Sequence, residues 1–523
     1  MSCCNADGGK RFAHAFSLPL LCCLFTAHAG WNITLFEALD QALKSNVDML
    51  LHEQQIIDAE GQVLQARGQF DPAIVAGVSR TRNLRPLRAD EITTLQVLGV
   101  ASNANQIHQL TTYQIGTKKV FLNGVSAEMT FNVSSIGDNL QSANGVPNQL
   151  AGTLGFTLKV PMGRNAGRET TGAEFDARQA EYEAARAELQ QNQARTILDT
   201  TTVYWDWVAS EKRLAIAVTT ERRLSDLVSE IKRLIDTGQT PRADIEIALA
   251  SRAEKVALRL TAEQAVDESR RKLARLMGLP ATRARELVRP ANDFPSYHEL
   301  PIDINAAHLI EQALASSADL DAARQRDQAA RYRLTAARNN RKPRFDLDLN
   351  VGYTGLAENV TTLQADRSLE NLAGPSMGVT LTLEWPWENN TMRGVHLSAA
   401  ANHDAAALRE RDLGQAIATN VPVMLDALRR ASAQLLEGIE AVKRYEITLK
   451  NEQTKRRLGS ATVIDVINVE DRLNNSLLTD VALRQRYATA IVELRFQLGR
   501  LVQRQGDKYQ ISVGALLGGN ALE

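Results

Sequence analysis

Several segments of the chain alternate strictly between apolar and polar residues. The segment 345–353 places Phe345, Leu347 and Tyr353 on one face and aspartate, asparagine and glycine on the other. The same alternation occurs at 125–133, 153–160 and 379–385, and more weakly at 72–79. Period two predicts β-strands in a sheet with one apolar and one polar face. Such a sheet either packs its apolar face on a core or turns it to lipid while its polar face lines water, and the strands alone leave both open.

Most of the remaining chain has the apolar stripe of amphipathic helices. The predicted helices cover residues 36–69, 165–237, 242–278, 305–341, 390–458 and 461–498. In each half, two shorter helices laid end to end match one longer helix, a column of about 105–110 Å at 1.5 Å per residue. Helices of this length need a coiled-coil-like partner along their whole length. The pattern therefore predicts four antiparallel helical columns that join strands at one end, as in a hollow pipe fixed in a membrane.

The same order of elements occurs twice along the chain. Residues that recur at matching spacing include Asp48 and Asp319, Pro72 and Pro343, Gly238 and Gly459, Asp244 and Asp465, and Gly278 and Gly499. A period this long is not that of a solenoid, so it indicates a duplicated half-structure. We place the first repeat at 30–278, an inter-repeat linker at 279–304, the second repeat at 305–499 and a C-terminal tail at 500–523.

Residues 1–29 have the pattern of a signal peptide. A basic pair precedes an apolar run at 16–26, and Ala27 and Ala29 fit the small-residue cleavage site, so the mature chain is expected to start at Gly30. All four cysteines lie inside this segment, so the mature chain is expected to lack disulfides and thiol chemistry. A secreted, cysteine-free, helix-rich chain favours the periplasm or outer membrane of a Gram-negative cell.

Charge and motifs argue against several classes of function. The formal net charge of −1 gives no case for nucleic acid binding. The histidines after the signal peptide are scattered, at 52, 108, 298, 308, 396 and 403. Motifs for nucleotide binding, zinc proteases and serine hydrolases do not occur. The sequence therefore predicts no catalytic residue, no cofactor and no metal site.

The motifs at the ends of the helices resemble those of the TolC family of outer-membrane efflux ducts. The segments GQFDPAIVAGVS at 68–79 and TLGFTLKVPMGRNAGR at 153–168 are similar to the entry of that family's first strand and the exit of its second. The pattern Gly-x5-Asp followed by Leu-x4-Gly, present in both halves, is similar to the family's periplasmic turn and the helix after it. The resemblance covers nearly all of the mature chain.

This resemblance implies a mainly α fold with a transmembrane β-barrel portion. Three copies would share one β-barrel in the outer membrane and one α-helical tunnel through the periplasm. Such a homotrimer is the outer-membrane channel of an efflux or type I secretion system, and it passes substrates outward from an inner-membrane pump and a periplasmic adaptor (membrane fusion) protein. The alternative is a periplasmic coiled-coil adaptor or scaffold. The second full copy argues against it, because an adaptor's helical hairpin interrupts one β domain and is not duplicated.

One segment departs from the family's pattern. Residues 84–149 form a longer stretch than their counterpart at 356–375, and they contain an apparent extra hairpin at 113–133 around Asn123 and Gly124. The family's four strands per protomer are therefore in doubt for this chain. The hairpin either adds strands to the sheet or decorates the extracellular mouth.

The family narrows its tunnel near the periplasmic turns, often with a ring of carboxylates. Asp465 lies at the matching position, Asn468 stands where a second acid can occur, and Asp244 holds the equivalent place in the first half. In a trimer these side chains would converge on one axis, where repulsion raises the pKa of each carboxyl and cations are attracted. Asp465 also follows Thr462 at capping-box spacing, so a gate and a helix cap are equal alternatives.

The turns themselves are the candidate surface for the adaptor. They comprise Gly238, Gln239, Thr240 and Pro241 in the first half and Gly459 and Ser460 in the second. Glycine is also an ordinary helix terminator. A purely structural role for these turns is therefore an equal alternative.

Overall fold

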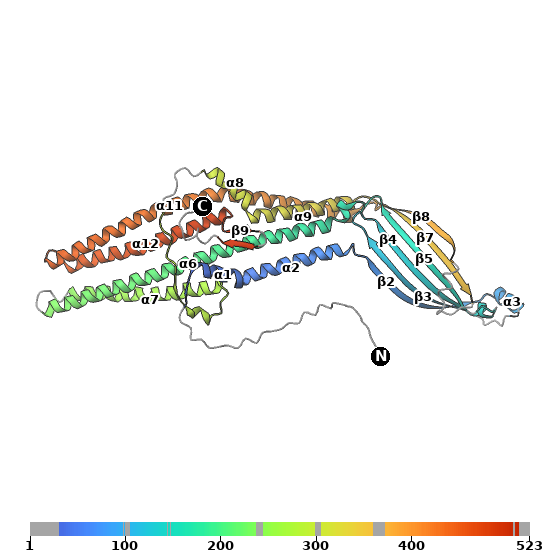
Figure 1. The fold of residues 1–523 in the computed structure, drawn as a ribbon, viewed down its shortest axis with the longest axis horizontal. Coiled ribbons are helices and arrows are strands. Elements are labelled where there is room, and N and C mark those ends of the chain that lie inside the picture. Colours follow the sequence, from blue (N-terminus) through green and yellow to red (C-terminus); the bar gives the residue numbers. More distant parts are fainter. Residues whose placement is uncertain are drawn as a thin grey trace, which may run out of the picture.

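The chain is elongated, with a β-sheet at one end and long helices that run from it to the other end (Figure 1). The computed structural model describes residues 31–97, 99, 105–143, 145–146, 148–236, 244–298, 305–358, 372–505 and 508–511. No helix within these residues is long and apolar enough to cross a membrane.

Six strands form the sheet. They are β2 (Ala73–Pro86), β3 (Asn105–Val120), β4 (Ser126–Asp138), β5 (Asn148–Pro161), β7 (Arg344–Glu358) and β8 (Leu372–Glu384). Their spatial order is β2-β3-β4-β5-β7-β8, and each neighbouring pair is antiparallel. The predicted strands are confirmed, and each is longer than the alternating segment that predicted it.

The extra hairpin lies inside the sheet. Its strands β3 and β4 separate β2 from β5, and its turn contains Gly124 with a φ of +89°. The alternative that the hairpin decorates the extracellular mouth is therefore wrong, and the sheet formed by the described residues has six strands instead of the four that the resemblance implies. Between β2 and β3 lies the short helix α3 (Ala89–Val97), at the tip of the molecule beyond the sheet (Figure 1), and α4 (Asn139–Ala143) follows β4.

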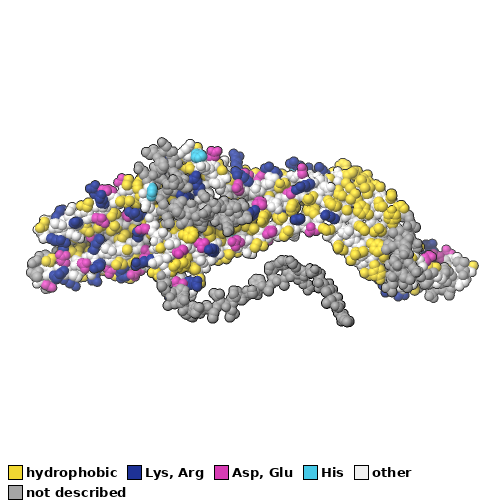
Figure 2. Space-filling model, in the orientation of Figure 1, with side chains coloured by type: hydrophobic (Ala, Val, Ile, Leu, Met, Phe, Trp, Pro, Cys, Tyr) yellow, Lys and Arg dark blue, Asp and Glu magenta, His cyan; other side chains and the backbone are white. Residues whose placement is uncertain are grey.

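The strand register gathers apolar side chains on one face of the sheet. Residues directly opposite each other in neighbouring strands point to the same face. One such row consists of Ile115, Phe131, Leu154 and Tyr353. The adjacent row, which points to the other face, consists of Gln114, Asn132, Thr153 and Thr354. Figure 2 shows the result, a hydrophobic surface over the strands, whereas charged side chains are spread along the helices.

Four helices continue from the sheet as one layer. In contact order they are α2 (Val47–Gly68), α6 (Ala173–Asp236), α9 (Ala318–Asn340) and α11 (Asn390–Arg457). A short helix, α5 (Arg168–Thr171), precedes α6, so the helix predicted from 165 begins later, after Asn165 and Gly167 adopt positive φ. Buried alanines such as Ala177, Ala180 and Ala329 let α6 and α9 approach closely.

At the end away from the sheet, each long helix pairs with the helix that follows it. α6 packs on α7 (Asp244–Leu276), and α11 packs on α12 (Val463–Gln497). A stripe of α6 that includes Leu224 and Ile231 contacts Ala248 of α7 and Val463 of α12. The two helical hairpins therefore lie side by side, which agrees with the four predicted columns.

Each predicted helix that leads into the sheet is broken once. The helix predicted at 36–69 consists of α1 (Leu35–Ser45) and α2, with Asn46 between them at a ψ of 132°. The helix predicted at 305–341 consists of α8 (Ala306–Ser316) and α9, with Ser317 between them at a ψ of 111°. In both cases the side chain of the intervening residue accepts a hydrogen bond from the next helix and caps it.

The carboxyl ends of α7 and α12 pack against these breaks. A Cβ on Gly278 would lie 2.1 Å from the carbonyl oxygen of Ser45, and a Cβ on Gly499 would lie 2.7 Å from that of Ser316. Asn46 also donates from its side-chain amide to the carbonyl of Leu276 at 3.0 Å. The predicted end-to-end stacking of the shorter helices therefore occurs where α7 meets the α1–α2 break and where α12 meets the α8–α9 break.

An apolar core in the middle of the molecule holds the layers together. Strand β1 (Trp31–Ile33) pairs in parallel with β6 (Leu287–Pro290), which follows the short helix η1 (Arg283–Glu286) within the predicted linker. Tyr204, Trp205 and Trp207 of α6 are fully buried here. The hydroxyl of Tyr204 donates to the Ile33 carbonyl at 3.1 Å, and burial raises the pKa of Tyr204 to about 12. In the predicted tail, β9 (Val502–Gln505) and β10 (Lys508–Ile511) form an antiparallel pair.

Candidate functional site

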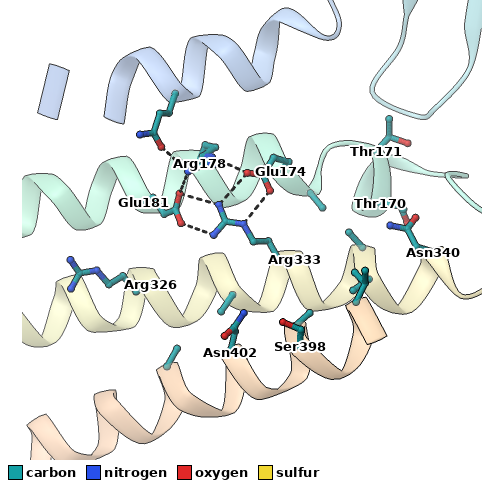
Figure 3. A pocket seen from close by; sticks show the side chains of 18 of the residues that line it. Thr170, Thr171, Glu174, Arg178, Glu181, Arg326, Arg333, Asn340, Ser398 and Asn402 are labelled. Atoms are coloured by element: carbon teal, nitrogen blue, oxygen red, sulfur yellow. Dashed lines mark hydrogen bonds and ion pairs between the residues drawn. The ribbon is translucent and has the colours of Figure 1, made fainter. Parts of the chain in front are cut away.

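One face of the helical layer lines a groove of about 1440 Å³ beside the sheet (Figure 3). Its lining residues recur every three or four positions on α6, α9 and α11, so each helix contributes a single face. Small residues such as Ala330 and Ala399 alternate there with polar ones such as Ser398 and Asn402. This arrangement forms a wide, open groove with a mixed apolar and polar lining, and not an enclosed pocket for a small ligand.

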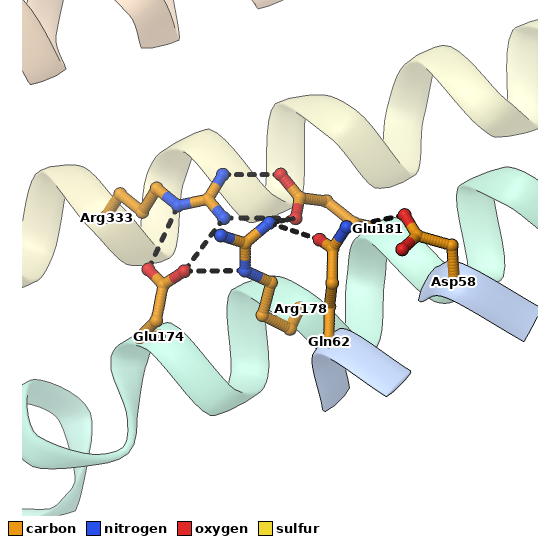
Figure 4. A network of polar contacts seen from close by, with 6 residues as sticks. All are labelled: Asp58, Gln62, Glu174, Arg178, Glu181 and Arg333. Carbon is orange, nitrogen blue, oxygen red and sulfur yellow. Dashed lines mark hydrogen bonds and ion pairs between the residues drawn. The ribbon is translucent and has the colours of Figure 1, made fainter. Parts of the chain in front are cut away.

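A network of ion pairs crosses the groove wall (Figure 4). Arg333 of α9 makes a bidentate contact with Glu181 of α6 at 2.5 and 3.0 Å, and a second with Glu174 at 3.1 Å through two nitrogens. Arg178 contacts the same two glutamates at 2.8 and 3.0 Å and donates to Gln62 of α2 at 2.6 Å. The network therefore ties three neighbouring helices together where they approach the sheet.

The protonation states of this network are set by its geometry. Burial raises the pKa of Glu181, but the hydrogen bonds and charges of Arg333 and Arg178 outweigh it and hold that pKa below the ordinary value. The hydrogen bond with Glu181 raises the pKa of Arg333 further above its ordinary value. Glu181 and Arg333 therefore stay charged at neutral pH, so the contact between them acts as a permanent clamp.

The charges that line the groove are nearly balanced. The charged lining residues are Arg178, Arg326, Arg333 and Arg409, and Glu174, Glu181 and Glu188. Arg326 pairs with Glu188, which joins α9 to α6 a further two turns from the sheet. A wall with interspersed charges of both signs suits a water-filled passage without strong preference for cations or anions.

A second ionic cluster lies on the polar face of the sheet, at its junction with the helices. Lys159 of β5 lies 3.2 Å from Asp346 and 3.5 Å from Asp348 of β7, and Arg344 lies 2.6 Å from Asp346. The side chain of Asp346 is buried among these cations. The cluster fastens β5 to β7, the point where the first half of the chain meets the second within the sheet.

At the other end of the molecule, Asp465 forms the predicted capping box. Its backbone N–H donates to the Thr462 hydroxyl at 3.2 Å, and its carboxylate accepts from the Thr462 N–H at 2.8 Å and from the Thr462 hydroxyl at 2.6 Å. These bonds, first that from the Thr462 side chain, lower the pKa of the Asp465 carboxyl. The side chain is exposed, as is that of Asn468 one turn later.

The remaining predicted site residues lie at or beside the turns. Asp244 is the first residue of α7, and its side chain lies outside the described part of the structure, as do Gly238, Gln239, Thr240 and Pro241. Gly459 ends α11 with a φ of +77°, and Ser460 donates both its N–H and its hydroxyl to the Lys455 carbonyl at 3.0 Å. These contacts close the helix end and leave the turn on the surface.

Comparison with known proteins gives a family match for the second half of the chain. Residues 309–500 match the family model described as outer membrane efflux protein. Those residues belong to the outer membrane efflux protein family. The family predicted from the sequence motifs is thereby confirmed. No curated protein matches the chain's sequence.

Solved outer-membrane channels share the fold of this chain along most of its length. The outer-membrane channel OprN superimposes with a TM-score of 0.65 at 16% identity, covering 89% of both chains. The outer-membrane protein VceC from Vibrio cholerae superimposes with a TM-score of 0.63 at 16% identity, and the match covers 89% of this chain and 96% of VceC. The outer-membrane channel CmeC of Campylobacter jejuni superimposes with a TM-score of 0.63 at 13% identity, and the match covers 94% of this chain and 90% of CmeC. The predicted fold class, long helices joined to a sheet, is confirmed.

Sequence analysis missed the contacts that join the two helical hairpins of the chain near its turns. Arg456 of α11 lies 2.6 Å from Glu230 of α6, and Arg223 of α6 lies 2.9 Å from Glu470 of α12. Lys255 of α7 is buried 2.8 Å from Asp471 of α12. In the sequence, each of these residues shows only as a charged position on an amphipathic helix. Such a position does not reveal which residue of another helix is its partner.

Proposed function

We propose that this protein is the outer-membrane channel of a Gram-negative efflux or type I secretion system. Three copies close their sheets into one β-barrel in the outer membrane and their helical layers into one tunnel through the periplasm. The observation that carries this proposal is the two-faced, open-edged sheet at the end of the long helices.

The apolar face of the sheet is more exposed than is usual for the surface of a soluble protein. On β8, the side chains of Met377, Val379, Leu381 and Leu383 are between 58 and 77% exposed. Exposed apolar patches of this kind mark membrane or protein contacts. Strands that alternate apolar-out and polar-in are the pattern of a transmembrane barrel, so lipid is the surrounding that this face fits.

The sheet also has two free edges, β2 and β8. Within a bilayer each unpaired backbone group costs several kcal/mol, so a spanning sheet has to close on itself. β2 and β8 run in opposite directions, because five antiparallel pairings separate them. The β8 edge of one copy therefore fits the β2 edge of the next as a further antiparallel pair.

The helical ends give the proposed periplasmic contacts. Gly459, Ser460 and the turn 238–241 form the surface offered to a periplasmic adaptor, through which an inner-membrane pump delivers substrate. Asp465, Asn468 and Asp244 lie just inside these turns, and in a trimer they would surround the axis as the narrow aperture. The polar face of the sheet and the groove on the helices line the wider passage beyond it.

Contact between the sheet and the membrane can be tested with two exposed tryptophans. Trp385 and Trp387 follow β8 and are 72 and 96% exposed, at the edge of the apolar face. Tryptophan is enriched at membrane interfaces. Trp205 and Trp207 are buried among the helices and serve as an internal reference.

The experiment compares fluorescence quenching of the detergent-purified, lipid-reconstituted protein by brominated lipids. The expected result is strong quenching in the wild type, most of which is lost in the double variant Trp385→Phe, Trp387→Phe. The matched variant Trp31→Phe should retain it, because Trp31 lies in the middle of the molecule beside β6. Recovery of the wild-type protein in the periplasmic soluble fraction, with no quenching by brominated lipid, would refute the proposed function.

A further inference from the structure

The hairpin β3–β4 is bonded into the sheet along its whole length. β3 is paired with β2 over the full length of β2, from Ala73–Lys118 to Pro86–Asn105. β4 is paired with β5 from Ser126–Lys159 to Gly137–Asn148. Neither strand therefore lies loosely over an otherwise complete sheet.

Both strands of the hairpin also carry the same two faces as their neighbours. Ile115 of β3 opposes Phe131 of β4 on the apolar face, and Gln114 opposes Asn132 on the polar face. On that polar face the hydroxyls of Thr112 and Ser134 lie within hydrogen-bonding distance at 3.0 Å. A segment that plugs a water-filled barrel contacts water on both of its faces, so an apolar face would not be expected on it.

The two ends of the hairpin are anchored at the same levels as the other strands. At the helical end, the Asn123 carbonyl accepts from the Gly167 N–H at 3.0 Å, and a Cβ on Gly124 would lie 2.2 Å from the Asn165 carbonyl. At the outer end, Asp138 is buried and accepts from Gln106 at 2.6 Å, while Asn139 accepts from the Ile107 N–H at 2.8 Å. The hairpin therefore spans the height of the sheet.

We propose that β3 and β4 are part of the membrane wall, so that the barrel of three copies contains eighteen strands, six from each. This inference rests on the proposed function. With strands about 4.8 Å apart, the hairpin adds about 10 Å to the wall of each copy. Because barrel diameter grows roughly linearly with strand number, the opening is about one and a half times as wide as with four strands per copy. The membrane passage then admits bulkier cargo, and selection of cargo falls to the helical end.

Site-directed spin labelling tests this proposal directly, since the chain after residue 29 contains no cysteine. Single cysteines replace Ile115 and Gln114 on β3, and Phe131 and Asn132 on β4, in the full-length protein reconstituted in lipid. Each nitroxide is measured for collision with oxygen, which concentrates in lipid, and with a water-soluble nickel chelate. We expect oxygen to dominate at 115 and 131 and the chelate to dominate at 114 and 132, with several-fold changes between adjacent positions.

The pair Val351→Cys and Asn350→Cys on β7 is the matched control, because β7 belongs to the sheet independently of the hairpin. Alternation on β7 together with chelate access at all four hairpin positions would place the hairpin in the lumen and overturn the eighteen-strand wall while the channel stands. Loss of alternation on β7 itself would instead refute the proposed membrane function. Two label pairs on two strands keep the test decisive if one variant does not fold.

Discussion

Alanine substitution at three helix-terminal glycines measures how much the packing of the α7 and α12 ends against the two helix breaks stabilises the middle of the molecule. Gly278, Gly499 and Gly459 all have positive φ, at +66°, +66° and +77°. They differ in what surrounds them. An added Cβ meets the Ser45 carbonyl oxygen at 2.1 Å for Gly278 and the Ser316 carbonyl oxygen at 2.7 Å for Gly499, whereas Gly459 has nothing within 4 Å.

The expected magnitudes follow from these distances. A left-handed backbone costs an alanine about 1–2 kcal/mol, and this is the whole expected effect of Gly459→Ala. Gly278→Ala adds an overlap with backbone that has to move by more than an ångström, and overpacking of this kind costs about 1–3 kcal/mol more. Gly499→Ala should fall between the two, because its closest contact is less severe.

Hydrogen–deuterium exchange of the reconstituted protein can measure each local opening. For Gly459→Ala, exchange in the last turn of α11 should accelerate roughly 5- to 30-fold. For Gly278→Ala, the end of α7 and the α1–α2 break should open together, faster by about another 5- to 150-fold. Equal effects at Gly278 and Gly459, or acceleration at α7 without any at residues 42–50, would show that the packing contact does not lock the column.

Three further predictions concern the helical end and the central core. Asp465→Ala should weaken cation block of single-channel conductance, whereas Thr462→Ala, which removes the cap and keeps the carboxylate, should not; an unchanged channel in both would leave Asp465 as a cap only. Because the pKa of Tyr204 is raised from 10.0 to about 12, its contribution to stability is complete below pH 10 and is lost as pH rises towards 12. Tyr204→Phe should reduce that alkaline loss in thermal unfolding scans, and an unchanged pH profile would contradict the buried hydroxyl. A double-mutant cycle on Arg456 and Glu230 should give a coupling free energy of at most about 1 kcal/mol that falls with added salt, because the pair is partly exposed; a salt-independent coupling would contradict this.

The two periodicities explain how much of the fold could be predicted. Alternation at 345–353 and 379–385 located β7 and β8, because the face of each strand residue depends only on its parity. The apolar stripe located α6 and α11 in a similar way, because the face of each helix residue depends only on its place in the 3.6-residue turn. The capping box of Asp465 was also predictable, since Thr462 lies three residues away.

The breaks at Asn46 and Ser317 could not be predicted from such patterns. Each lies within a stretch of helical character, and at each break Gly278 or Gly499 brings another helix end against the chain. The clamp of Arg333 on Glu174 and Glu181 was missed likewise, since the partners are 159 and 152 residues apart in the chain. A local pattern does not identify a distant partner.

The sequence by itself determined which face of each alternating strand is apolar and where the long helices lie, because both depend on residues a few positions apart. It also indicated a hairpin at 113–133 without deciding where that hairpin lies. Only the tertiary structure decided that β3 and β4 enter between β2 and β5 and widen the sheet to six strands. The physical reason is that a strand's neighbours are chosen by backbone hydrogen bonds, which are alike for all residues except proline and therefore leave little trace in the sequence.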